Sequence, residues 1–198
     1  MSERQPVTHL QTDEELIAAY QQGNPAAYNV LVGRYKDQLI NYVFRYLGDY
    51  DEADDVVQES FIRVYRKKEQ YKPIAKFSTW IYTIATNLAK TQLQRRKRHS
   101  IFSLNRSGRG EDEKSIDIPD SRENVEAYAD NTLKQEMIQD ALMKMSSKYR
   151  DVVILFEIQE LTYDEICAIT GLNIGTVKSR LNRGRAKLRE LLKDLRDE

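Results

Sequence analysis

The chain has few of the residues on which metal sites, disulfides and most catalytic centres depend. Its 198 residues include one cysteine and two histidines. A single cysteine cannot form an internal disulfide, and such usage is typical of a reducing compartment. The cysteine and the histidines lie far apart in sequence and offer no metal-ligand spacing. We expect neither a metal nor another cofactor.

Motifs of the common enzyme classes are also missing. The sequence contains no glycine-rich phosphate loop, no H-E-x-x-H pattern and no recognisable pairing of a nucleophile with a histidine. Its carboxylates gather on one predicted helix surface, which favours a docking face over an acid–base pair. We therefore expect a protein that is not an enzyme.

Long apolar runs and net charge are absent too. No run approaches the ~18 residues of a membrane span, and the first residues, MSERQPVTHLQ, lack the apolar core of a secretory signal. We therefore expect a soluble, cytoplasmic protein. The 31 basic side chains balance 31 acidic ones, so any attraction to nucleic acid must come from local segregation of charge.

Only four prolines and eight glycines interrupt the chain. Apolar residues recur at three- and four-residue spacings, and strict alternation is rare, which predicts an all-α fold. Between residues 101 and 128 this rhythm disappears in a stretch rich in Ser, Gly and Asp, which predicts a flexible linker. The sequence thus predicts two small helical domains, over residues 12–100 and 129–195.

The second domain contains a predicted helix-turn-helix over Leu161 to Arg189. Thr162 and Glu165 form a capping box for its first helix. A glycine at Gly171 permits the positive φ of a tight stop, and Asn173 can cap the second helix.

The second helix of this motif carries short polar side chains followed by cations. Its predicted exposed residues are Thr176, Lys178, Ser179, Asn182, Arg183, Arg185, Lys187 and Arg189. This order suits base-edge contacts near the helix start and phosphate contacts further along. The alternative is a solvated amphipathic helix in an ordinary bundle, but the capping box and turn glycine favour DNA binding.

Two helices of the first domain carry further signals. The predicted helix over residues 51–67 has acids in its first half and cations at its end. The helix dipole explains part of this polarity, and the dense acidic surface also suits docking on a basic protein. The predicted helix from Phe77 to about Arg98 places aromatics and amides beside a basic run. Unpaired bases and their phosphates would bind such a surface, although Trp80 is equally compatible with a core position.

Three motifs in order now resemble a known family. They are DDVVQESF at residues 54–61, FSTWIYTIATN at residues 77–87 and the C-terminal helix-turn-helix. Together they resemble bacterial RNA polymerase sigma factors of the extracytoplasmic-function (ECF) type, over nearly the whole chain except its ends and the linker. The resemblance implies a transcription initiation factor with a region 2 domain and a region 4 domain.

The resemblance also implies site residues and partners. Residues expected to bind the β′ clamp of core RNA polymerase are Asp54, Asp55, Val57, Gln58, Glu59 and Phe61. Those expected to recognise and open the minus-ten element are Tyr71, Lys72, Lys76, Trp80, Thr83, Asn87 and Lys90. Those expected to read the minus-thirty-five element are Thr176, Lys178, Ser179, Arg180, Asn182 and Arg183.

By this resemblance Tyr71 and Asn87 line the pocket for a flipped-out base and Trp80 supports it. The C-terminal domain meets the β flap, and an anti-sigma factor, often membrane-anchored, holds such proteins inactive. The chain departs from the family at Tyr65, where tryptophan is common, and at Pro73 in the minus-ten loop. Asn182 also stands where many relatives have a larger residue, so the promoter sequences do not carry over.

Two other functions use parts of the same pattern. A stand-alone helix-turn-helix regulator explains residues 161–189 but leaves the acidic helix and the FSTW helix without a role. An adaptor or decoy that binds an anti-sigma factor would keep the acidic face, yet it needs no cationic recognition helix.

Overall fold

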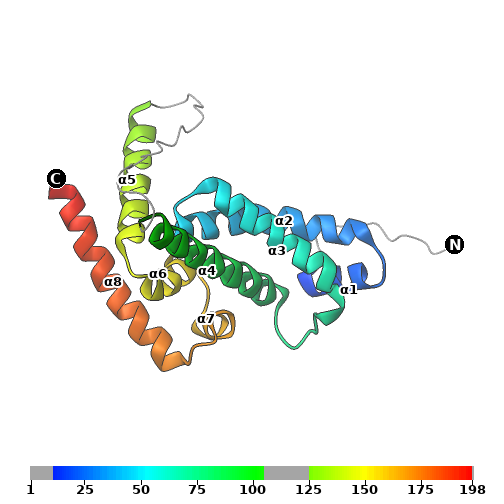
Figure 1. Ribbon diagram of the computed structural model, residues 1–198. Coiled ribbons are helices and arrows are strands. Elements are labelled where there is room, and N and C mark those ends of the chain that lie inside the picture. Colours follow the sequence, from blue (N-terminus) through cyan, green and yellow to red (C-terminus); the bar gives the residue numbers. More distant parts are fainter. Residues whose placement is uncertain (1–10, 105–124, 198) are drawn as a thin grey trace.

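The computed structural model describes residues 11–104 and 125–197, and every regular element in these two stretches is helical. An N-terminal unit comprises α1 (Asp13–Gln21), α2 (Pro25–Leu47), α3 (Tyr50–Lys67), the short η1 (Lys68–Gln70) and α4 (Phe77–Leu104). A C-terminal unit comprises α5 (Val125–Lys144), α6 (Ser147–Val153), a π-helical turn η2 (Ile154–Ile158), α7 (Tyr163–Thr170) and α8 (Ile174–Asp197). The predicted all-α class is confirmed (Figure 1).

Local capping sets the helix ends of the N-terminal unit. Thr12 and Glu15 form the capping box of α1, because each side chain accepts a hydrogen bond from the other's backbone N–H. Asn24 caps α2, and its side-chain oxygen accepts from the Ala26 N–H at 3.1 Å. Gly48 ends α2 at φ 75°, a left-handed conformation that disfavours side chains with a Cβ.

Helix α2 is the centre of the N-terminal unit and packs against α1, α3 and α4. Its inward face follows the predicted three-four rhythm and includes Leu31, Leu39, Tyr42 and Val43, all fully buried. Several of the tyrosines are core residues, and Tyr42 meets Tyr82 edge to face at 5.5 Å between ring centroids.

The C-terminal unit packs its helices around α8, which contacts α5, α6 and α7. The crossing of α6 and α8 is close. A Cβ added to Gly184 would lie 2.6 Å from Cγ2 of the fully buried Val153. Arg150 of α6 is 5% exposed and donates to the backbone oxygens of Met143 and Met145 at 2.8 and 2.9 Å. The guanidinium thereby fixes the turn between α5 and α6.

The helices extend into both ends of the predicted linker. Helix α4 continues to Leu104 and α5 begins at Val125, so both helices reach into the predicted linker of residues 101–128. The rest of the predicted linker, residues 105–124, lies outside the described residues.

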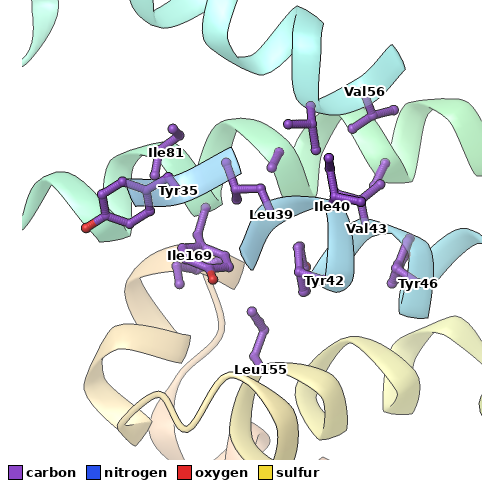
Figure 2. Packing of buried hydrophobic residues seen from close by; sticks show 14 of the residues in the cluster. Tyr35, Leu39, Ile40, Tyr42, Val43, Tyr46, Val56, Ile81, Leu155 and Ile169 are labelled. Atoms are coloured by element: carbon purple, nitrogen blue, oxygen red, sulfur yellow. The ribbon is translucent and has the colours of Figure 1, made fainter. Parts of the chain in front are cut away.

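The two units pack against each other. Helix α4 contacts α7, and α2 contacts α5, α6 and η2. Buried apolar residues of both units belong to one continuous cluster. Figure 2 shows Leu155 of η2 pointing toward Tyr42 of α2. We call the arrangement with the units in contact the closed arrangement.

Candidate functional site

One face of α3 presents acids and amides to solvent. Asp55 and Gln58 are exposed, and Asp54 and Glu59 are half-buried. Asp54 accepts a hydrogen bond from the Gln58 side chain at 2.6 Å, and Glu59 pairs with Arg63 at 3.0 Å. These contacts between residues four apart hold the side chains in an ordered row along the helix.

Two residues predicted for this docking face lie elsewhere. Val57 and Phe61 are 1% and 7% exposed and pack in the core of the N-terminal unit. Residues four apart share one helix face, and for these two that face points inward. In this conformation Val57 and Phe61 support the helix from its buried side, and their predicted contact with polymerase stays a prediction.

Two exposed apolar residues complete the α3 face. Ile62 is 41% exposed and Tyr65 is 60% exposed. They follow Asp55 and Gln58 at helical spacing, so α3 presents an acidic half and an apolar half on one side. Ile62 was not among the predicted docking residues. It is an apolar residue that lies outside the buried helix side of Phe61 and Val64. We call Asp55, Gln58, Ile62 and Tyr65 the α3 face.

The loop before α4 and the first turns of α4 form a second surface. The Phe77 backbone N–H donates to the Glu14 carboxylate at 3.0 Å, which caps the start of α4 from α1. Lys72 and Ile74 are exposed, with Ile74 at 89%. Asn87 is exposed, and Trp80 and Thr83 are half-buried. These predicted minus-ten residues lie in the loop before α4 and in the N-terminal half of α4, and they include both polar and aromatic side chains.

Tyr71 lies in a different environment from the one the sequence suggested. It is 7% exposed, its hydroxyl donates to the Ala75 oxygen at 2.8 Å, and its ring lies 5.3 Å from that of Trp80. Burial is the first cause of its raised pKa. In this conformation the ring anchors the loop on Phe77 and Trp80 and is covered where a base would stack.

Two cations of the same surface are paired with acids of the C-terminal unit. Lys76 Nζ lies 2.8 Å from Glu165 Oε1, and Lys90 Nζ lies 2.8 Å from Asp151 Oδ2. The pKa of Glu165 is lowered, with the hydrogen bond from Lys76 as its first cause. In the closed arrangement, therefore, both of these predicted DNA-binding lysines form ion pairs with carboxylates of the C-terminal unit.

The helix-turn-helix has the predicted local structure. Thr162 and Glu165 form its capping box, and Gly171 ends α7 at φ 72°. Asn173 caps α8 and accepts from the Thr176 backbone N–H at 2.8 Å. Val177 and Leu181 are buried at 0% and 1% exposure and fix the rotation of α8.

The exposed side of α8 is cationic and hollowed near its start. Lys178, Ser179, Asn182 and Arg183 are exposed, and Thr176 and Arg180 are half-buried. A shallow pocket is lined by Thr176, Ser179, Arg180 and Arg183 of α8, with Lys148 and Tyr149 of α6. Arg183 and then Lys148 lower the pKa of the Tyr149 hydroxyl. Backbone or base-edge acceptors of DNA fit these donors.

Tyr149 and Lys148 were not among the predicted contacts. They precede the helix-turn-helix by more than ten residues, and only the packing of α6 beside α8 brings them to the same pocket. Their sequence signal was weak, because a tyrosine beside a lysine in a short helix has many ordinary roles.

Among the described residues no group of three or more His, Cys, Asp or Glu side chains is arranged to hold a metal ion. Within the same part of the chain, no helix is both long and apolar enough to cross a membrane.

Comparisons with known proteins identify the family of the chain. Sigma-70 region 2 matches residues 31–99, and Sigma-70 region 4 matches residues 135–188. The chain is 36% identical over 180 residues to the ECF RNA polymerase sigma factor SigW of Bacillus subtilis, covering 90% of this chain and 96% of SigW. The chain belongs to the ECF sigma factors. The sigma-E factor of Haemophilus influenzae is 32% identical over 187 residues, with 93% and 97% covered.

Solved structures share the fold of this sigma factor. CnrH in complex with the cytosolic domain of CnrY matches with a TM-score of 0.68 at 24% identity, over 93% of this chain and 99% of that one. RpoE in complex with the anti-sigma factor NepR from Bartonella quintana also matches with a TM-score of 0.68 at 24% identity, over 84% and 96%. As a sigma factor the chain is a transcription initiation factor rather than an enzyme, and it acts with core RNA polymerase on promoter DNA.

Proposed function

We propose that the α3 face docks this sigma factor on the β′ clamp of core RNA polymerase. The observation that carries this proposal is that four side chains are exposed on one side of α3. Asp55 and Gln58 are polar, and Ile62 and Tyr65 are apolar. Apolar side chains supply buried area at an interface, and the acids steer a basic partner and set its register. An acidic face would repel DNA phosphates, so its partner is a protein.

The surface from Lys72 to Lys90 would recognise and open the minus-ten element. Aromatic and amide groups there suit unpaired bases, and Lys72, Lys76 and Lys90 suit phosphates. One captured base returns roughly 1–3 kcal/mol. A single pocket therefore cannot offset several opened base pairs, and the polymerase channel supplies the rest.

The α8 face would read the minus-thirty-five element as duplex. Ser179 and Arg183 stand nearest the base edges, with Lys178, Arg180 and Asn182 beside them, and Lys148 and Tyr149 reach the backbone. The C-terminal unit also meets the β flap. We assign minus-ten recognition to the predicted domain at residues 12–100 and minus-thirty-five recognition to the predicted domain at residues 129–195.

Regulation by an anti-sigma factor, including a membrane-anchored one, fits this chain as well. The fold is shared with proteins solved in complex with CnrY and with NepR. Because a sigma factor acts with RNA polymerase, we infer that this one acts in the cytoplasm. A stand-alone regulator would have no use for the α3 face, and a decoy would have no use for the α8 face.

Run-off transcription with core polymerase tests the proposal. We expect the wild-type chain to direct initiation. The double variant Asp55→Arg, Glu59→Arg reverses one acid of the α3 face and the half-buried acid beside that face, and it should lose core binding and initiation. The matched control Asp37→Arg, Asp140→Arg reverses two exposed acids outside the α3 face and should retain both activities. Core affinity unchanged by the α3 variant would show that docking uses another surface.

A further inference from the structure

Four side chains form a column of contacts beside helix α8 of the C-terminal unit. The rings of Phe156 and Tyr163 are stacked, with centroids 5.0 Å apart and an angle of 27° between their planes. The Lys178 ammonium lies over the Tyr163 ring, 5.5 Å from its centroid. The Arg185 guanidinium lies over the Phe156 ring at 5.0 Å. We call the two rings the aromatic stack.

The two cations of the column belong to one side of α8. Lys178 and Arg185 are seven residues apart, which is two helical turns or about 10 Å along the axis. Neither ring comes from α8, because Phe156 lies in η2 and Tyr163 begins α7. A cation within about 6 Å of a ring centroid is attracted by the ring. The aromatic stack therefore bridges the two cations along this side of the helix.

The backbone that carries the two rings is fixed locally. Tyr163 follows Thr162, whose capping box sets the start of α7. Phe156 follows the fully buried Leu155 in the π-helical turn η2, and such turns are frequent at functional sites. Glu160 then takes a φ of 53°, which is uncommon for a residue other than glycine. Both rings thus have defined positions before any DNA is bound.

The two ends of the column differ in what the cation can still do. Arg185 is already the ion-pair partner of Glu157. Lys178 is exposed, and it forms no ion pair with any residue that the structure describes. Its ammonium has three donors and no acceptor. The Tyr163 ring therefore holds the side chain of Lys178 while its donors remain available to an acceptor in solution.

A lysine held in this way suits the reading of a base. A long, free lysine side chain loses much rotamer freedom when it is fixed in a complex, and a side chain that is already held loses less. In the major groove, guanine presents two neighbouring acceptors, N7 and O6, that lysine can bind. A fixed ammonium beside Ser179 and Arg183 can therefore favour guanine at one position of a duplex.

We propose that the aromatic stack positions Lys178 to read one base of the minus-thirty-five element. Phe156 and Tyr163 are then positioning residues that set base preference without contacting that base. This inference rests on the proposed function of α8 and adds to it the residues that orient one of its side chains.

Binding of the holoenzyme to a promoter library randomised in the upstream element tests the inference. Lys178→Ala identifies the base position that Lys178 reads. Tyr163→Leu should reduce the preference at that same position about two- to five-fold, the size of one exposed cation–π contact. Tyr163→Phe keeps a ring and should keep the preference. Adding Lys178→Ala to Tyr163→Leu should reduce it no further, because the two residues act together.

Two further variants give matched comparisons. Arg185→Ala leaves both rings in place and should leave the preference at the Lys178 position unchanged. Phe156→Leu removes the ring behind Tyr163 and should reduce the preference less than Tyr163→Leu does. Circular dichroism checks that each variant remains helical.

Nuclear magnetic resonance of the free full chain tests the contact without DNA or polymerase. A ring beneath the ammonium should shift the ε-protons of Lys178 upfield of those of the other lysines, and Lys178→Arg assigns the signal. The shift should persist in Tyr163→Phe and vanish in Tyr163→Leu. A lysine signal without this shift in the wild type would overturn the inference even if Tyr163→Leu failed to fold.

The outcomes separate the inference from the function on which it rests. A loss of preference confined to the Lys178 position in Tyr163→Leu, with rescue by Tyr163→Phe, supports the positioning role. An equal loss of affinity for all sequences overturns that role and leaves the rings a structural part of the fold. If Lys178→Ala alters no base position, the proposed reading by Lys178 fails, and the inference fails with it.

Discussion

The N-terminal unit carries its own core, whereas the C-terminal unit completes part of its buried surface against its neighbour. In the N-terminal unit Leu31, Leu39 and Phe77 are fully buried, and the Phe77 ring meets Tyr35 and Tyr71 of the same unit. In the C-terminal unit, by contrast, Asp151 is buried with its partners on α2 and α4. The buried acid of the C-terminal unit thus depends on its neighbour for both of its partners.

The largest expected effect separates the inner and outer sides of α3. Phe61→Ala removes a ring from the core of the N-terminal unit and should lower the free energy of unfolding by about 3–5 kcal/mol. Ile62→Ala, one residue later on the exposed side, should cost less than about 0.5 kcal/mol of stability. Urea unfolding measures both. Ile62→Ala should still weaken core binding, and equal stability losses would mean that α3 is rotated from the position found here.

The next effect concerns the C-terminal unit's own surface. Arg183→Ala should reduce affinity for the minus-thirty-five element by about 1–3 kcal/mol and relax preference at one base position. Binding of the holoenzyme to promoter variants measures this. Arg185→Ala is the matched control, because Arg185 is an ion-pair partner of Glu157 and lies over the Phe156 ring. A similar loss for both variants would indicate nonspecific phosphate contact only.

Glycine-to-alanine changes compare the packing of the two units. Gly184→Ala pushes a methyl group against Val153 and should destabilise the C-terminal unit by about 1–2 kcal/mol, since overpacking outweighs the helix gain. Gly33→Ala on α2 meets nothing within 4 Å and should stabilise the N-terminal unit by about 0.5–1 kcal/mol. Thermal unfolding of each variant shows the sign. A stabilising Gly184→Ala would contradict the close α6–α8 crossing.

The smallest effect is a pH dependence of the stability that the Glu165–Lys76 ion pair adds at the interface between the units. The lowered pKa of Glu165 means that its ionised form is favoured in the fold, so its contribution is present at neutral pH and is lost as pH falls through that pKa. Lys76 supplies the charge and Glu14 lies nearby. The thermal midpoint of the wild type should exceed that of Glu165→Gln at neutral pH, and the gap should close only as pH falls below the ordinary pKa range of glutamate. A gap that widens on acidification would reverse the assigned sign.

Local signals predicted much of this structure. Thr12, Asn24, Thr162 and Gly171 mark helix ends through contacts with residues up to four positions away, and a sequence displays such contacts directly. The exposed α8 face followed from the same periodicity. Val57 and Phe61 were assigned to the docking face through their position in a family motif, whereas both are buried in the structure.

The contacts between the two units could not be predicted from the sequence. Asp151 meets Tyr42 across 109 positions, and Gln159 meets Tyr82 across 77. An acid in an amphipathic helix is normally solvated, and nothing in its neighbours marks it for burial. The burial of Tyr71 was not predicted for the same reason, because it depends on the packing of Phe77 and Trp80 against the loop.

Initiation by core polymerase on a library with randomised promoter sequence tests the central claim most directly. With this sigma factor added, we expect start sites preceded by two enriched short motifs at a fixed separation, and Arg183→Ala should blur only the upstream motif. Initiation no more selective than with core alone would contradict the division of labour between the two units.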